Sequence, residues 1–169
     1  MGEAEERGTE DLSVIFRDLG PEEIDDYIDF DAPISWGFLT EEERESLSYD
    51  GYLRVHRELI RSLYESNIKN RIIAAYIDGS IVGVVWIGMK LDTVHYVPVC
   101  YIYDIEVKEE LRGKGLGSKL LHMAEETCRE WGLSEVMLSV EASNSEALKW
   151  YERRGYEVKR LLLSKSSST

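Results

Sequence analysis

The sequence predicts a single α/β domain built on a mixed sheet, and three observations support this. The chain has 169 residues, 43% of them hydrophobic, which suffices for one domain with a substantial core. Two apolar runs in its first half are joined by Asp78-Gly79, a pair typical of a hairpin between antiparallel strands. The second half alternates strand-like and helix-like segments, as in β-α-β units.

The N-terminal part is predicted to contain one strand followed by helices. Residues 12–18 form the first predicted strand, and Pro21 begins a short acidic helix because proline suits the first helical turn. Residues 31–38 form an irregular aromatic segment. A helix is predicted over residues 40–67, because this stretch opens with a Thr-x-x-Glu capping box and continues with apolar residues at helical spacing.

The remaining elements follow from apolar runs and the glycines that end them. Gly132 and Gly155 each follow a helical pattern, where glycine commonly ends a helix. The predicted elements are strands at 71–77, 81–89 and 97–107, a helix at 116–131, a strand at 135–140, a helix at 144–154 and a strand at 156–163. Residues 11–164 are thus one predicted domain, between a disordered acidic tail at 1–10 and a polar tail at 165–169.

The net charge of −13 is concentrated in the N-terminal third. Residues 1–50 carry a net charge of −14 and residues 51–169 a net charge of +1. This balance argues against binding of nucleic acid, which normally needs a basic face. The acidic part could attract a cationic substrate, or it could serve solubility alone.

The sequence indicates a cytoplasmic protein. No apolar run is long enough to span a membrane, and residues 1–7 lack the features of a signal peptide. Only Cys100 and Cys128 are present, so no disulfide framework is indicated and two thiols suit a reducing compartment. We expect both cysteines to be apolar core residues rather than nucleophiles.

A glycine-rich stretch at residues 112–118, Arg-Gly-Lys-Gly-Leu-Gly-Ser, predicts a phosphate site between a strand and a helix. Glycines at alternate positions expose backbone amides, and amides at a helix N-terminus bind anions with help from the helix dipole. Arg112, Lys114 and Lys119 add positive charge. The spacing matches neither the dinucleotide fingerprint nor the P-loop, so the expected ligand is another phosphate or pyrophosphate compound.

A second motif lies at residues 143–156 and reads Asn144-x-x-Ala147-x-x-x-Tyr151-x-x-x-Gly155-Tyr156. Together with the Arg-x-x-Gly-x-Gly pattern that begins at Arg112, it resembles the GNAT superfamily of N-acetyltransferases. The resemblance implies a GNAT fold, with a mixed, mostly antiparallel sheet of six to seven strands flanked by four helices. It also implies acetyl-CoA as co-substrate and no metal.

The resemblance further implies which residues bind acetyl-CoA. In the family, the strand before the glycine-rich loop bulges and its unpaired amides contact the co-substrate, while the loop holds the pyrophosphate. The cofactor-binding residues are then expected to be Ile105, Glu106, Val107, Arg112, Gly113, Lys114, Gly115, Leu116, Gly117, Ser118 and Asn144.

The implied reaction is direct attack of a primary amine on the thioester. Tyr151 is expected to give a proton to the leaving CoA thiolate, and Asp104 to anchor or deprotonate the amine. Glu106 and Glu141 are alternatives for the base, and an ordered water near Tyr101 is another. No metal ligand pattern is found among the histidines.

The acceptor stays open at this stage. Strand 101–107 is similar to that of polyamine acetyltransferases, although Tyr103 replaces an acid found there, and it also resembles that of N-terminal acetyltransferases. The acceptor could therefore be a polyamine, a protein N-terminus or another small amine. The rival function is a non-catalytic acyl-CoA sensor on the same fold, and a weaker alternative is transfer of an acyl group longer than acetyl. The protein could also form a homodimer through its last strand.

Overall fold

The computed structural model describes residues 13–165 and divides into two parts, Met1–Met137 and Leu138–Thr169. The predicted tail at 1–10 lies outside the described residues, as do residues 166–169 of the C-terminal tail. Each part is described on its own below. The first part holds most of the secondary structure.

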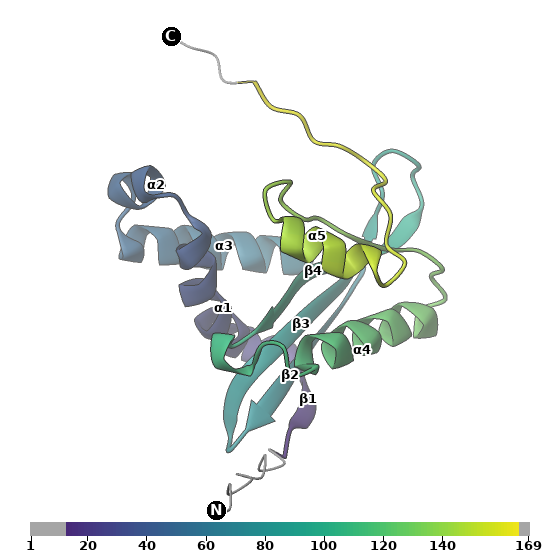
Figure 1. Ribbon diagram of the computed structural model, residues 1–169, viewed down its shortest axis with the longest axis horizontal. Helices are drawn as coiled ribbons and strands as arrows, with labels where there is room; N and C mark the ends of the chain where they lie inside the picture. Colours follow the sequence, from purple (N-terminus) through teal and green to yellow (C-terminus); the bar gives the residue numbers. More distant parts are fainter. Residues whose placement is uncertain (1–12, 166–169) are drawn as a thin grey trace, which may run out of the picture. The chain divides into compact units, whose positions relative to one another are not determined.

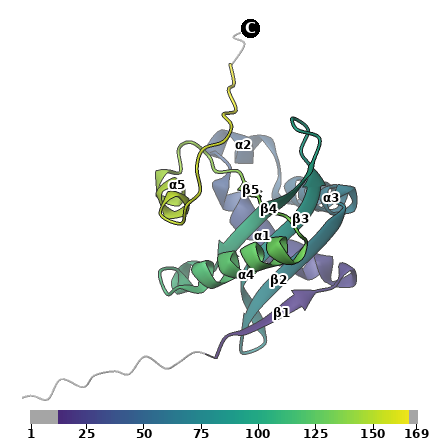
Figure 2. The same cartoon turned by 90° about the vertical axis from the view of Figure 1, so that its right-hand side faces the viewer.

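Five strands form one sheet in the order of the chain, β1-β2-β3-β4-β5. Figure 1 labels β1 to β4, and Figure 2 labels β5 as well. Antiparallel pairing joins β1 (Ile15–Leu19) to β2 (Lys69–Ile77), β2 to β3 (Ser80–Leu91), and β3 to β4 (Pro98–Val107), and β5 (Val136–Leu138) is short. Asp78 and Gly79 connect β2 to β3 with φ values of 49° and 76°, as expected for a tight hairpin turn. The predicted hairpin is confirmed.

The helices of the first part lie on both faces of the sheet. Figure 2 shows α4 (Leu116–Glu130) across one face, with α1 (Ile24–Phe38) and α3 (Tyr49–Ser66) on the other. The face under α1 and α3 carries an apolar cluster, which consists of Leu19, Tyr27, Ile28, Ile60, Ile72, Ala74, Val84 and Trp86. This packing fixes α1 and α3 against β2 and β3, next to β4.

Two predictions were wrong, one of an irregular segment and one of a single long helix. Residues 31–38 belong to α1, which follows a 3₁₀ turn at Pro21–Glu23 and continues through Pro33. Residues 40–67 form two helices, α2 (Glu41–Ser46) and α3, because the Ser48 side chain accepts a hydrogen bond from Gly51 N and starts a new helix. The capping box of α2 is confirmed, since Glu43 N donates to Thr40 Oγ1 at 3.2 Å.

The predicted element count is also wrong. Residues 13–165 contain five strands and five α-helices, the last being α5 (Ser145–Glu152), rather than six to seven strands and four helices. The strand predicted at 156–163 is not formed, and Leu162 there is fully exposed. An apolar run becomes a strand only when its backbone groups find a partner strand, and this run has no ladder in the described structure.

The two cysteines form a disulfide between β4 and α4, which corrects the expectation of free thiols. Cys100 and Cys128 have Cα atoms 5.6 Å apart, and both side chains are fully buried. The expectation that they lie in the core is confirmed. None of the helices in residues 13–165 has the length and apolar character needed to cross a membrane.

Candidate active site

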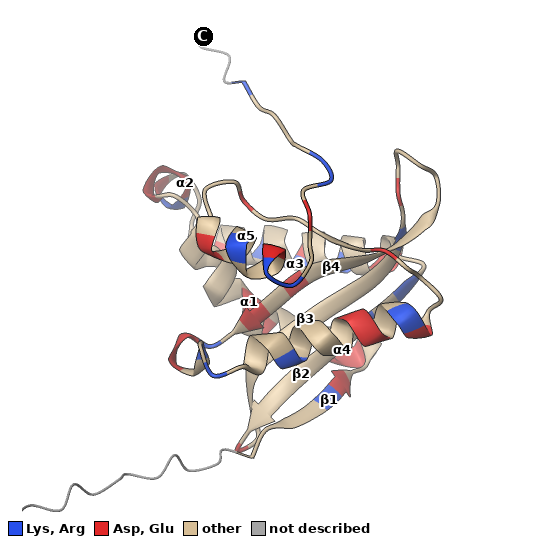
Figure 3. Ribbon diagram, turned by 45° about the vertical axis from the view of Figure 1, so that its right-hand side comes forward, with Lys and Arg blue, Asp and Glu red and all other residues tan. Residues whose placement is uncertain are grey.

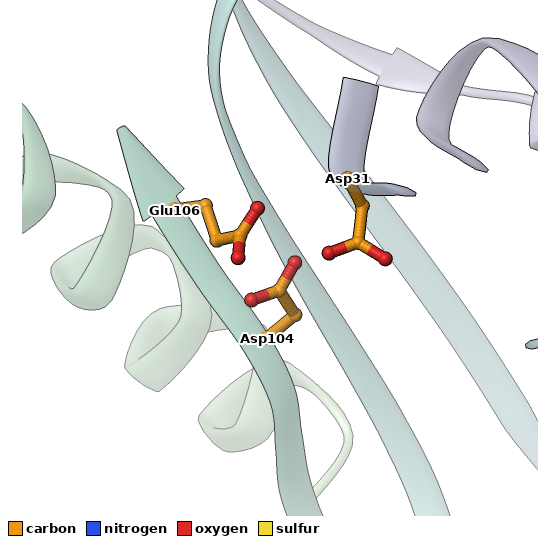
Figure 4. A group of neighbouring side chains, drawn as sticks. All are labelled: Asp31, Asp104 and Glu106. Carbon is orange, nitrogen blue, oxygen red and sulfur yellow. The ribbon is translucent and has the colours of Figure 1, made fainter. Parts of the chain in front are cut away.

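Three carboxylic acids meet where α1 packs beside β4. Asp104 and Glu106 lie two residues apart on β4 and so share one face of the strand, and Asp31 comes from α1. One carboxylate oxygen from each of the three residues lies within 4.8 Å of those from the other two. Figure 4 shows the three carboxyl groups directed toward a common point. We call these three residues the acidic cluster.

The members of the acidic cluster differ in their hydrogen bonds. Asp31, 3% exposed, accepts a hydrogen bond from Ser35 Oγ at 2.8 Å, and its Oδ2 lies 2.6 Å from His56 Nε2. The Tyr27 hydroxyl donates to Asp104 Oδ2 at 3.1 Å. The Oε2 atom of Glu106 is buried and has no hydrogen-bond partner among the described residues.

Burial and mutual repulsion hold protons on the two acids of β4. Burial, with a further contribution from Asp31, raises the pKa of Asp104 to about 8, although the Tyr27 hydroxyl opposes this. Burial, followed by the charges of Asp104 and Asp31, raises the pKa of Glu106 to about 10, while Arg112 acts in the opposite direction. A cation placed at the acidic cluster would therefore displace protons. Such perturbed acids are typical of catalytic sites.

A pocket of about 150 Å³ opens beside the acidic cluster. Its walls combine two acids with aromatic and aliphatic side chains, and they consist of Tyr27, Asp31, Ser35, His56, Ile60, Leu63, Trp86, Tyr103 and Asp104. A larger hollow, of about 340 Å³, lies along α3 alone. Its Arg57 and Arg61 pair with Asp29 and Asp25 of α1, so it is a salt-bridged surface rather than a site.

The glycine-rich loop joins β4 to α4 after a 3₁₀ turn at Glu109–Leu111. Gly113 and Gly115 have φ values of 74° and 84°, and Gly115 is the N-cap residue of α4. Arg112 Nε donates to Val107 O at 3.1 Å and so ties the loop to the end of β4. Figure 3 shows Lys and Arg positions on this loop, as the predicted anion site requires.

No side chain caps the N-terminus of α4. Amides at the start of a helix can bind an anion when no side chain caps them, and the helix dipole adds to the attraction. A Cβ atom added at Gly113 or Gly115 would meet nothing within 4 Å, so the space over both glycines is open. The loop residues thus fit the pyrophosphate of a CoA thioester.

Residues 105–107 are in regular register with β3, opposite Val85, Val84 and Gly83. The register shift in this ladder lies between Trp86, which faces Asp104, and Ile87, which faces Ile102. The extra residue of β4 is therefore Tyr103. The contact of Ile105, Glu106 and Val107 with acetyl-CoA stays a prediction.

Asn144, Tyr151 and Glu141 belong to the second part of the chain. The Asn144 side chain accepts a hydrogen bond from Ala147 N at 3.1 Å and caps α5. Tyr151 is 8% exposed and packs edge-on against Trp150 and Tyr156. Their roles toward the co-substrate stay predictions.

The sequence indicated part of this site. Asp104 and Glu106 were expected to bear on the chemistry, whereas Tyr27, Asp31 and His56 were missed. Tyr27, Asp31 and Ser35 follow each other at intervals of four along α1, a spacing that places them on one helix face. That spacing was the available signal, and the prediction of an irregular segment at 31–38 concealed it.

Comparisons with known proteins agree on one family. The family model described as "Acetyltransferase (GNAT) family" matches residues 26–156. A protein of Pyrococcus furiosus, provisionally assigned as an acetyl transferase, has a TM-score of 0.81 and 38% identity, over 92% of this chain and 100% of its own.

Two further proteins extend the comparison. An uncharacterised N-acetyltransferase of Bacillus subtilis, YycN, is 33% identical over 80 residues, 47% of this chain and 51% of its own. This chain spans about half the length of the first curated relatives it matches. A protein solved with a CoA-acetylneamine bisubstrate analogue has a TM-score of 0.64 at 16% identity, over 92% of this chain and 99% of its own. At that identity it shows the fold alone.

Proposed function

Since the chain belongs to the acetyltransferase (GNAT) family, we propose that it transfers the acetyl group of acetyl-CoA directly to the nitrogen of a primary amine. The observation that supports this most is that the acidic cluster and the glycine-rich loop are close in the chain and joined by a hydrogen bond. Glu106 of the acidic cluster adjoins Val107, whose carbonyl accepts the hydrogen bond from Arg112 of the loop. An amine held at the acidic cluster would thus lie beside a loop suited to a CoA thioester.

The co-substrate would be held by the glycine-rich loop. Backbone amides of Gly113, Gly115 and the first turn of α4 would donate to the pyrophosphate, and the basic side chains of the loop would balance its charge. Leu116, Gly117 and Ser118 form that first turn. Asn144 and the amides of residues 105–107 would contact the arm that carries the acetyl group.

The amine must lose its proton before it can attack. A base works best when its pKa lies near the working pH, and Asp104, with a pKa of about 8, meets this condition. Glu106 is the alternative in the same cluster, and Glu141 is the alternative in the second part. The attack forms the C–N bond and breaks the C–S bond, and we assign Tyr151 as the donor of the proton that the CoA thiolate accepts.

Replacing Tyr151 with phenylalanine tests the acid role. We expect kcat to fall about 10-fold to 100-fold with little change in KM for acetyl-CoA, because the lost interaction is made only as the thiolate leaves. Thiol release at saturating amine measures this. Tyr156→Phe removes a neighbouring hydroxyl from the same part and serves as the control. An unchanged kcat for Tyr151→Phe would exclude the acid role.

Replacing Gly115 with valine tests the loop. The φ of 84° at Gly115 disfavours any β-branched residue, and the new side chain would also cover the amides. We expect the Kd for acetyl-CoA to rise about 10-fold to 100-fold. Gly132→Val at the other end of α4, also at positive φ, is the matched control for stability. Equal Kd values for the two variants would contradict the assignment.

The proposed function itself is tested by thiol release from acetyl-CoA across a panel of amines. The panel contains diamines, amino acids, an aminoglycoside and short peptides with free N-termini. Turnover of any amine supports acetyl transfer. Binding of acetyl-CoA without turnover of any amine would instead support a non-catalytic acyl-CoA sensor, and parallel assays with propionyl-CoA and butyryl-CoA test longer acyl groups.

We also propose that the protein works in the cytoplasm, where acetyl-CoA is made and used, although the Cys100–Cys128 disulfide removes free thiols as an argument for that compartment. The net charge of −13 is consistent with a small cationic substrate rather than with nucleic acid or an anionic membrane surface. A homodimer stays a proposal, and light scattering after size exclusion tests it.

A further inference from the structure

We propose that Tyr27 of α1 is the positioning residue for Asp104, because it holds the carboxylate in one orientation and keeps it able to accept the proton of the amine. This role rests on the proposed function, in which Asp104 takes that proton. Two geometric features carry it. One is the hydrogen bond between the two side chains, and the other is the packing that fixes the Tyr27 ring.

The Tyr27 hydroxyl connects α1 directly to the acid on β4. It donates to Asp104 Oδ2 at 3.1 Å, across 77 residues of the chain. Both side chains line the pocket of about 150 Å³ beside the acidic cluster. A phenol hydroxyl has a single proton to donate, so this bond uses the whole donor capacity of Tyr27.

The ring of Tyr27 is fixed by its packing. It is 1% exposed and lies edge-on against Trp86, with ring centroids 5.7 Å apart. Trp86 is the residue opposite Asp104 in the ladder of β3 and β4, and its Nε1 donates to Asn70 Oδ1 at 3.0 Å. Tyr27 therefore contacts both members of one cross-strand pair, with its ring on Trp86 and its hydroxyl on Asp104.

Packing alone does not explain the hydroxyl. The ring of a phenylalanine would fill the same space, and burying a hydroxyl costs free energy unless the group finds a hydrogen-bond partner. Here the partner is the carboxylate that the proposed reaction uses. The polar atom of Tyr27 therefore serves Asp104, while its ring serves the core.

Tyr27 can act as a donor but not as the base. Burial, followed by the charges of Asp104, Asp31 and Glu106, raises the pKa of Tyr27 well above its usual range, so the phenol keeps its proton. The pKa of Asp104 is raised by burial and by Asp31, and the Tyr27 hydroxyl is the first of the contacts that oppose this rise, before the Ile105 backbone N–H. Tyr27 thus lowers the pH at which Asp104 becomes able to accept a proton.

The other titratable groups around Asp104 do not take over this role. Those of residues 13–165 that face it, directly or through a neighbour, are Asp31 of α1, Glu106 of β4, His56 of α3 and Arg112 of the loop. The two acids oppose the charged form of Asp104. His56 acts through Asp31, and Arg112 acts through Glu106. On β3, the residue opposite Asp104 is the uncharged Trp86.

The hydrogen bond also favours one oxygen of Asp104 for the chemistry. Because Oδ2 receives the Tyr27 hydroxyl, the proton of the amine is expected to pass to Oδ1. The N–H bond breaks, an O–H bond forms on Asp104, and the electron pair stays on the nitrogen for attack on the thioester carbonyl. A carboxylate free to rotate would present this oxygen only part of the time.

The test measures kcat against pH for Tyr27→Phe and for wild type. Loss of a hydrogen bond to a charged group should move the titration of Asp104 upward by about one pH unit. We therefore expect kcat to fall about 10-fold at pH 7 and only about 2-fold at pH 9, with little change in KM for acetyl-CoA. A loss of the same size at every pH would indicate a merely structural role and overturn the proposal.

Tyr52→Phe is the matched control. Tyr52 is 8% exposed, and its hydroxyl also donates to a partner at 3.1 Å, but that partner is Ala32 O of α1. The structural cost of the two variants should be similar, and only Tyr27→Phe should change the shape of the pH profile. The same change in both variants would overturn the assignment.

A double-mutant cycle tests whether Tyr27 acts through Asp104. In an Asp104→Asn background, Tyr27→Phe should have no further effect on the residual kcat at any pH, because the group that it positions is already absent. Additive losses would show that Tyr27 acts on the reaction by another route.

Carbon NMR separates this inference from the proposed function. Protein labelled with ¹³C at the aspartate carboxyl carbons is titrated without acetyl-CoA, and Asp104→Asn identifies the Asp104 signal. We expect the midpoint to lie about one pH unit higher in Tyr27→Phe than in wild type and to be unchanged in Tyr52→Phe. That result without turnover of any amine would uphold the contact and count against acetyl transfer alone. An unchanged midpoint in Tyr27→Phe would overturn the role of Tyr27 even where turnover is normal.

Discussion

Replacing Asp104 with asparagine is expected to lower kcat about 100-fold to 10,000-fold and to raise the melting temperature. The loss of activity follows from removal of the base that accepts the amine proton. The gain in stability follows because the native site buries an acid whose charge is opposed by its surroundings. Asparagine has nearly the same shape, and its carbonyl oxygen can still accept the hydrogen bond from Tyr27.

The raised pKa of Asp104 determines how the stability difference between Asp104→Asn and wild type changes with pH. The pKa of Asp104 is raised from 3.8 to about 8 by burial, so the native state binds this proton more tightly than the unfolded chain does. Its stabilising contribution is complete below pH 4 and is lost as the pH rises toward 8. Relative to wild type, Asp104→Asn should therefore gain stability as the pH increases from 5 to 8, by about 3 to 4 kcal/mol over that range.

Calorimetric melting at pH 5 and pH 8, with thiol release on the same preparations, measures both effects. Asp29→Asn, on the exposed side of α1, is the control and should change neither. Glu106→Gln distinguishes the two acids, since the true base is the one whose loss removes the rise of kcat with pH. A melting temperature that falls in Asp104→Asn at pH 8 would show that its charge is already balanced in the native site.

The residues predicted correctly from the sequence are those whose neighbours are close in the chain. The glycine-rich loop, the capping box at Thr40 and the turn at Asp78-Gly79 each depend on a few adjacent residues, so local patterns suffice. The acidic cluster depends on α1 reaching β4. Asp31 and Asp104 are brought together by tertiary packing, which no local pattern encodes.

The wrong predictions also concern features that depend on tertiary packing rather than on adjacent residues. Pro33 suggested an irregular segment, yet burial of Tyr27, Ile28 and Ala32 against the sheet keeps α1 helical through it. The run at 156–163 has strand-like composition, but a strand exists only with a pairing partner. Cys100 and Cys128 were expected to remain thiols. They approach each other only because α4 lies across β4, and this packing cannot be read from the sequence around either cysteine.

Removing the disulfide is expected to lower the stability by about 3 to 4 kcal/mol. The bond joins residues 28 apart and closes a loop of the unfolded chain whose entropy it restricts. The melting temperature should fall by about 6 to 16 °C in a protein of this size. Activity at 25 °C should change little, because Cys128 lies in the last turn of α4, far along the helix from the glycine-rich loop.

Two preparations separate the covalent bond from the packing of the sulfur atoms. The Cys100→Ala/Cys128→Ala variant loses the bond and some volume, whereas reduced wild-type protein loses the bond alone. Both should melt well below the oxidised protein, and the reduced wild type should be the more stable of the two. Because both cysteines are fully buried, a reductant should reach the bond only after opening of the native structure. Rapid reduction under native conditions would mean that β4 and α4 separate readily, and the acid-bearing strand could not then be rigidly held.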